Sequence, residues 1–141
     1  MRADNNQNIR EDVSFIKELA QNIRTNVEQV IVGKTDVIDL TLTALIAQGH
    51  VLLDDVPGTG KTKLARSIAR SIDAGFSRVQ FTADLLPSDL TGIHYYNQKE
   101  SEFVFRAGPL FSNILLADEI NRATARTQSS LLECMEERQI T

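Results

Sequence analysis

The chain has 141 residues, of which 42% are apolar and 24% are charged, so it holds enough apolar material for one folded domain. Its net charge of −4 argues against a protein that binds mainly by neutralising nucleic-acid phosphates. The N-terminus lacks the apolar core of a secretory signal, no apolar run reaches membrane-spanning length, and the single Cys134 cannot form an internal disulfide. We therefore expect a protein of the cytoplasm.

Two helices are predicted ahead of the first strand. We expect residues 1–11 to form a polar, disordered leader and residues 12–141 to form the folded core. After the leader, apolar residues recur at alternating steps of three and four, which is the spacing of one helix face. They are Val13, Ile16, Ala20, Ile23, Val27 and Val30. Gly33 interrupts the pattern, and a second helix is predicted over residues 37–47.

A strand, a helix and a second strand are predicted next. Residues 51–53 form a short apolar run beside a Gly-rich loop, which is typical of a strand buried on both faces. The helix that follows closes at Gly75, and residues 78–82 alternate as a strand does. The apolar face of that helix consists of Leu64, Ala65, Ile68, Ala69 and Ile72.

The last part of the chain continues the alternation. Residues 84–92 contain Pro87 and predict a loop or short helix, and residues 93–105 predict a hairpin that turns near residues 99–101. Residues 114–117 predict a third buried strand. The final helix is predicted over residues 127–137, with Leu131, Leu132 and Met135 facing inward. Helices that alternate with apolar strands indicate an α/β fold with a parallel sheet.

A phosphate-binding loop stands between the first predicted strand and its helix, in the context that a Walker A motif requires. Gly58 and Gly60 let backbone amides approach a polyphosphate at a helix N-terminus. Lys61 would reach the β- and γ-phosphates, and the Thr62 hydroxyl would ligate Mg²⁺. The strict motif begins with Gly where this chain has Asp55, a carboxylate that could weaken nucleotide binding. The predicted nucleotide contacts of the loop are Pro57, Gly58, Thr59, Gly60, Lys61, Thr62 and Lys63.

A second acidic motif follows the third strand, as a Walker B element does. Asp118 would hold Mg²⁺ together with Thr62, and Glu119 would orient the attacking water. Acidic residues at a strand end also serve as plain helix caps, but the phosphate loop upstream favours the catalytic interpretation. An arginine just beyond them, Arg122 or Arg126, could reach a phosphate across a subunit boundary.

Four segments carry a family resemblance. LLDDVPGTGKT, DLLPSDLTG, FRAGPLF and ILLADEINRA together resemble MoxR-type AAA+ ATPases over nearly the whole chain. The resemblance implies a three-layer αβα sandwich, with Val32 and Gly33 near the adenine. It also implies that the hairpin of residues 93–105 belongs to the insertion shared with magnesium chelatase and MCM-type motors, and that Gln80 restrains the catalytic glutamate.

The same resemblance implies an activity. Members of the MoxR family assemble as ring hexamers and use Mg²⁺-dependent ATP turnover to remodel or activate partner proteins, often ones with von Willebrand A domains. The resemblance implies that the nucleotide-binding core of residues 12–141 is incomplete. Beyond Thr141 we expect the sensor asparagine with its strand, the arginine finger and the helical lid. The core is therefore expected to be weakly active or inactive by itself. Two alternatives stay open: a nucleotide-gated binding module without appreciable turnover, and a nucleic-acid motor of the same clade. A P-loop GTPase would need an NKxD-like motif, which this chain lacks.

Overall fold

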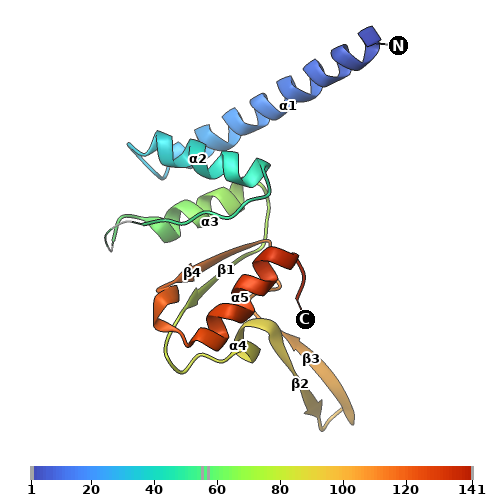
Figure 1. The fold of residues 1–141 in the computed structure, drawn as a ribbon, viewed down its shortest axis with the longest axis vertical. Helices are drawn as coiled ribbons and strands as arrows, with labels where there is room; N and C mark the ends of the chain where they lie inside the picture. The colour runs from blue at the N-terminus through green and yellow to red at the C-terminus, as the bar shows by residue number, and fades with distance from the viewer. Residues whose placement is uncertain (1, 55, 57, 141) are drawn as a thin grey trace. The chain divides into compact units, whose positions relative to one another are not determined.

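The structure is a computed structural model that describes residues 2–54, 56 and 58–140. It divides into two compact units, Met1–Asp73 and Ala74–Thr141, and each is described by itself. The first unit contains the helices α1 (Arg2–Glu28), α2 (Thr35–Ile46) and α3 (Lys61–Ser71) (Figure 1). The second contains β1 (Phe76–Gln80), α4 (Pro87–Thr91), β2 (Gly92–Asn97), β3 (Glu102–Ala107), β4 (Ile114–Asp118), the 3₁₀ turn η1 (Ile120–Arg122) and α5 (Ala125–Glu137).

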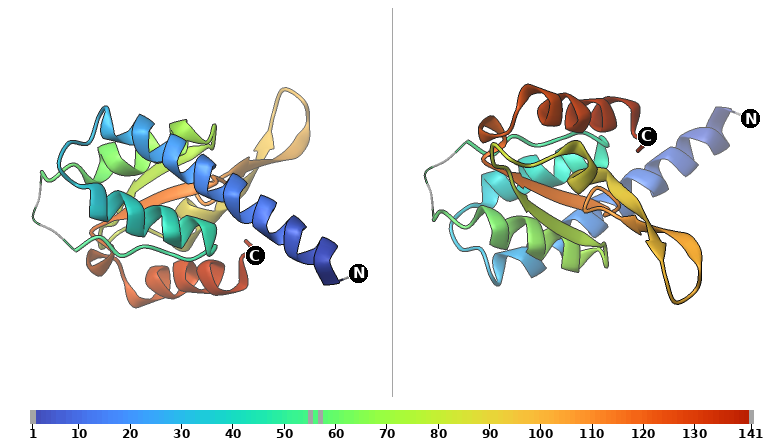
Figure 2. Two further views of the ribbon diagram at one scale, coloured as in Figure 1. Left: turned by 90° about the horizontal axis from the view of Figure 1, so that it is seen from above. Right: turned by 90° about the horizontal axis from the view of Figure 1, so that it is seen from below.

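The first unit is a layer of three helices in which α1 packs against both α2 and α3 (Figure 2). Only part of each apolar face predicted from the sequence is buried in its core, and Val30, at the end of the face predicted for α1, is 56% exposed. An ion pair of 2.6 Å between Arg24 Nε and Asp39 Oδ1 ties α1 to α2. The buried side chains are Ile23, Val27, Ile31, Ile38, Leu42, Leu64, Ile68 and Ala69.

Helix α1 differs from the prediction at its N-terminus. It begins at Arg2, so residues 2–11, for which we expected a disordered leader, are helical. The physical reason is that no Pro or Gly interrupts the chain from Arg2 to Glu28, so the helix can continue upstream of its packed face. Upstream of Ala20 the helix extends past its partners, and Val13 and Ile16 are exposed there.

The strand predicted over residues 51–53 is absent from the structure. These residues have no strand assignment, and Leu52 is 88% exposed. A strand exists only where a neighbour shares its hydrogen bonds, and in the described part of the chain β1 and β4 pair with each other and β2 with β3. The apolar run therefore has the composition of a strand, but it does not indicate which strand would form hydrogen bonds with it.

The second unit is built on the parallel pair β1 and β4. Phe76 pairs with Ile114, and the register continues to Gln80, which pairs with Asp118. Val79 and Phe81 are buried, as their alternation predicted, and pack with residues of α4 and α5. The core cluster consists of Val79, Phe81, Leu90, Ala123 and Leu131. The parallel strands confirm the α/β prediction for this part of the chain.

The antiparallel hairpin β2–β3 leads away from this core (Figures 1 and 2). It forms where the sequence predicted it, with its turn after Asn97. At its base Gly92 and Gly108 allow a close backbone approach, because a Cβ at Gly108 would overlap the carbonyl oxygen of Leu90.

Helix α5 covers the core of the second unit through part of its predicted face. Leu131 is 3% exposed and Met135 packs against the cluster, as expected, whereas Leu132 is 54% exposed and the prediction that it faces inward is wrong. One step along a helix turns a side chain by about 100°, so adjacent leucines cannot both point to a narrow core. The buried Thr127 hydroxyl donates to the Leu85 carbonyl at 2.7 Å and fixes the start of the helix.

Candidate functional site

The phosphate-binding loop leads directly into helix α3. Gly58 and Gly60 have φ of 85° and 93°, a region that side-chain-bearing residues rarely adopt. A Cβ at either position would meet nothing within 4 Å, so the space beside both glycines is open. Gly60 is the N-cap of α3, which begins at Lys61, and the amides of the first turn have no carbonyl partner within the helix. Open space beside the amides of a helix start is what an anion needs.

The side chains of the loop are arranged around this helix start. Thr59 Oγ1 donates to the Val56 carbonyl at 3.1 Å and closes the turn. Lys61 and Thr62 are half-buried, and Lys63 is exposed. The Thr62 hydroxyl has no hydrogen-bond partner among the described residues, so it is available to a ligand. Asp55 and Pro57, which we also assigned to the loop, lie outside the described residues.

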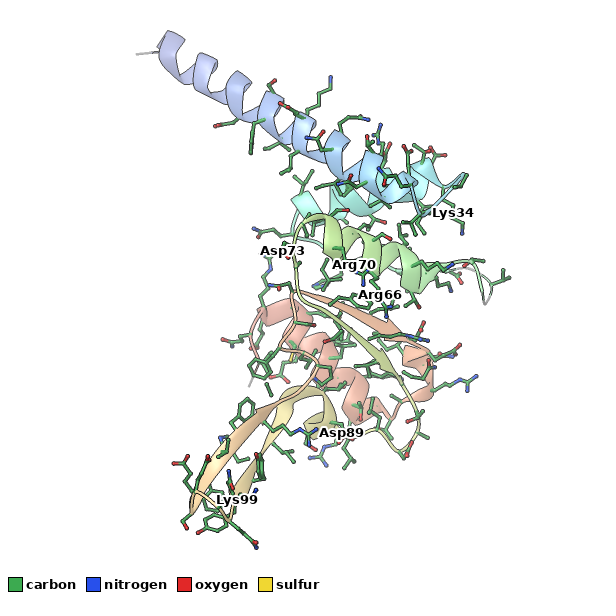
Figure 3. The ribbon with its side chains drawn as sticks, turned by 180° about the vertical axis from the view of Figure 1, so that it is seen from behind. Lys34, Arg66, Arg70, Asp73, Asp89 and Lys99 are labelled. Atoms are coloured by element: carbon green, nitrogen blue, oxygen red, sulfur yellow. The ribbon has the colours of Figure 1, made fainter. Side chains whose placement is uncertain are left out.

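A cavity of about 260 Å³ opens beside the loop, within the first unit. Thr59, Gly60 and Lys61 line it, and Lys34, which is labelled in Figure 3, adds a second cation from the connection between α1 and α2. Most of the remaining lining is apolar. It consists of Ile31, Val37, Leu40, Thr41, Val51, Leu52, Leu53, Asp54 and Leu64. An apolar recess that ends at a cationic, amide-rich loop suits a ligand with a planar base at one end and phosphates at the other.

The residues predicted to contact the adenine are sequence neighbours of two residues that line this cavity. Val32 is 86% exposed and Gly33 has a φ of 76°, and neither lines the cavity. Their neighbours Ile31 and Lys34 do, and sequence reasoning missed both. The assignment of Val32 and Gly33 to the adenine stays a prediction. Ile31 follows Val27 by four residues and so extends the apolar face of α1. Its burial could therefore be predicted from the sequence, but the cavity beside it could not.

In the second unit, Asp118 ends strand β4 opposite Gln80 of β1. Its carboxylate oxygen Oδ2 accepts a hydrogen bond of 2.9 Å from Arg78 Nε and forms an ion pair with Arg78 Nη2 at 2.7 Å. Arg78 also lies 3.4 Å from Gln80 Oε1. Sequence reasoning missed Arg78, because the contact depends on the register of two strands far apart in the chain.

Glu119 follows Asp118 in a left-handed conformation, with φ of 56° and ψ of 41°. This conformation is costly for a residue with a side chain, and such residues gather at functional sites. The Glu119 carboxylate accepts a hydrogen bond of 3.2 Å from Arg122 Nε. The structure gives Gln80 no hydrogen bond to Glu119 among the described residues, and its restraining role stays a prediction.

The protein ligands of a metal ion are few. No group of three or more His, Cys, Asp or Glu side chains that could hold a metal is found among the described residues. A magnesium ion usually keeps several waters and is held by one or two carboxylates together with substrate phosphates. The predicted ligands Thr62 and Asp118 belong to different units, and their joint site stays a prediction.

A Gly-rich loop on a helix start, an apolar cavity beside it and a strand that ends in an Asp-Glu pair define the class of P-loop nucleotide-binding proteins. Residues 50–141 match the family "ATPase family associated with various cellular activities (AAA)". The chain belongs to this AAA family of ATPases, and the MoxR-type resemblance is confirmed by its relatives.

Three comparisons illustrate the relationship. The chain is 58% identical to "Uncharacterized protein YeaC" of Bacillus subtilis over 82% of this chain and 36% of that protein. It is 47% identical to "Chaperone MoxR1" of Mycobacterium tuberculosis over 81% of this chain and 30% of that protein. The crystal structure of a candidate ATPase from Cytophaga hutchinsonii matches with a TM-score of 0.84 and 42% identity, covering 96% of this chain and 41% of that chain. The likeness confirms the predicted AAA+ fold class.

The chain spans about a third of the length of the curated relatives that it matches, at 36% and 30% of the first two. No helix among the described residues has both the length and the apolar character needed to cross a membrane.

Proposed function

We propose that this chain supplies the nucleotide-binding part of an Mg²⁺-dependent ATPase that remodels or activates partner proteins. The observation that carries the proposal is the cavity of the first unit, where an apolar recess meets Gly60 and Lys61. At about 260 Å³ it is slightly smaller than common ligand pockets of roughly 300–1,000 Å³ and suits the base end of a nucleotide. The phosphates would then extend along the open side of the loop.

Each polar residue of the site has a proposed task. The amides around Gly60 and the ammonium group of Lys61 would bind and orient the phosphates, which is most of what phosphoryl transfer asks of a protein. Thr62 and Asp118 are the proposed magnesium ligands, one from each unit. Magnesium, when bound with the nucleotide, would neutralise charge that develops on the phosphates. Glu119 would orient the attacking water and polarise it toward the γ-phosphate.

The partners belong to the same proposal. We infer a homo-oligomeric ring, a hexamer, that acts in the cytoplasm on client proteins or proteins with von Willebrand A domains. The name of one relative, "Chaperone MoxR1", supports action on proteins. The net charge of −4 favours proteins over nucleic acid as partners, because strong nucleic-acid binding needs an excess of Lys and Arg.

A turnover assay on the full-length protein tests the proposal. We expect Lys61→Ala to weaken nucleotide binding, and Glu119→Gln to bind ATP normally while phosphate release falls at least about a hundredfold, the usual loss of a positioned acid-base group. Hydrolysis at the parent rate by both variants would refute the site assignment. Normal ATP binding without turnover in the parent would favour a nucleotide-gated module, and stimulation by DNA at moderate salt would favour a nucleic-acid motor.

A further inference from the structure

One face of the β1–β4 pair carries an arginine that the proposed mechanism does not use. Arg78 and Gln80 are two residues apart on β1 and therefore lie on the same face. Asp118 is the register partner of Gln80 and shares that face. Val79, between the two polar residues, is buried with the core cluster on the other side. The fold thus fixes Arg78 next to the end of β4.

The contact between Arg78 and Asp118 is one-sided. Two of the guanidinium nitrogens reach Oδ2, Nη2 in an ion pair at 2.7 Å and Nε in a hydrogen bond of 2.9 Å, and Oδ1 has no hydrogen-bond partner among the described residues. The side chains are 47% and 24% exposed, so the carboxylate is partly shielded from water. A charge-assisted hydrogen bond of this length, together with the ion pair, holds the carboxylate in one orientation. Oδ1 therefore stays available to a cation, while Oδ2 contacts the positive charge of Arg78.

We propose that Arg78 is the built-in counter-ion of the magnesium-binding carboxylate and sets the Mg²⁺ concentration that the site needs. The proposal rests on the proposed function, in which Asp118 is a magnesium ligand. Arg78 opposes the metal through its charge: a unit charge about 5 Å from a divalent ion weakens its binding roughly tenfold even with water-like screening. It helps the metal only by orienting one short side chain, which has few rotamers to lose. The charge effect is the larger one.

Removing the guanidinium should therefore tighten magnesium binding. The measurement is the dissociation constant of N-methylanthraniloyl-ADP on the full-length protein, in EDTA and across a series of free Mg²⁺ concentrations. We expect Arg78→Met to lower the half-saturating Mg²⁺ concentration by about three- to tenfold, with the affinity in EDTA unchanged. Arg78→Lys keeps the charge and should remain near the parent. Arg106→Met makes the same change on exposed β3 of the same unit and should shift nothing.

Further variants separate the possible failures. Arg78→Gln keeps a hydrogen-bond donor without charge, and it must shift the midpoint in the same direction as Arg78→Met, which guards against misfolding of either variant. If Asp118→Asn leaves the magnesium response intact, the metal ligand of the proposed function is wrong. If Asp118→Asn abolishes the response while Arg78→Met and Arg78→Gln leave the midpoint unchanged or raise it, the counter-ion role is wrong and the proposed function stands.

Discussion

Replacing Gly60 by alanine probes the phosphate loop through its backbone. Gly60 has a φ of 93°, and a Cβ there would touch no protein atom within 4 Å. The substitution therefore creates no clash in the protein itself, and its direct cost is the left-handed conformation, about 1–2 kcal/mol for a residue with a side chain. In the proposed site, a phosphate would occupy part of the space that the methyl group enters.

The size of the binding defect follows from that strain. If the loop of the Gly60→Ala variant relaxes to a negative φ when no nucleotide is bound, binding must restore the strained form. A cost of about 1–2 kcal/mol then weakens nucleotide binding by about 5- to 30-fold, before any overlap with the phosphates is counted.

The assay combines nucleotide titration with urea unfolding of the full-length protein. In the urea unfolding alone, Gly33→Ala is the control for strain, because Gly33 also has a positive φ, 76°, and open space around its Cβ position. Both variants should lose similar free energy of unfolding if the loop of Gly60→Ala does not relax. A Gly60→Ala protein that binds ADP as tightly as the parent would refute the placement of phosphate beside this glycine.

Three further predictions concern the second unit and the thiol. Leu131→Ala should lower the free energy of unfolding by about 2–5 kcal/mol, because Leu131 is 3% exposed, whereas its neighbour Leu132, 54% exposed, should lose less than about 1 kcal/mol when truncated; equal losses in urea unfolding would contradict the assigned helix face. Gly108→Ala should destabilise by about 1–3 kcal/mol, since its Cβ would overlap the Leu90 carbonyl, and an unchanged thermal midpoint would show that the backbone can shift there. Burial raises the pKa of the Cys134 thiol, so less thiolate is present at pH 8 and iodoacetamide should alkylate it more slowly in the folded protein than in urea; equal rates would mean that the thiol is not shielded.

Local patterns predicted most of the elements. The spacing of Ile23 and Val27 gave the buried face of α1, and the alternation of Val79 and Phe81 gave the strand β1. Predictions failed where the outcome depended on distant partners. Residues 51–53 have strand composition but need a hydrogen-bonded neighbour, and the helical start of α1 depended on the absence of any interruption rather than on an apolar pattern.

The candidate site shows the same division. The residue types of the phosphate loop predicted its open glycines, because the chemistry of phosphate binding is local to six residues. The cavity beside it is also lined by Lys34, which precedes α2, and by Val37 of α2, and Arg78 reaches Asp118 across 40 positions in sequence. Contacts of this kind depend on packing and register, and no short motif encodes them.

The left-handed backbone of Glu119 lowers the stability of the folded protein at a residue that we propose takes part in ATP hydrolysis. Glycine would adopt φ of 56° without strain, so Glu119→Gly should leave the folded protein as stable or more stable by up to about 1 kcal/mol, while removing the proposed base. Selection for thermal stability alone would then favour a variant that lacks the proposed catalytic carboxylate. Gln48, Asp73, Ser101 and Arg138 also have a positive φ, and what distinguishes Glu119 is that the same residue carries the proposed water-orienting carboxylate.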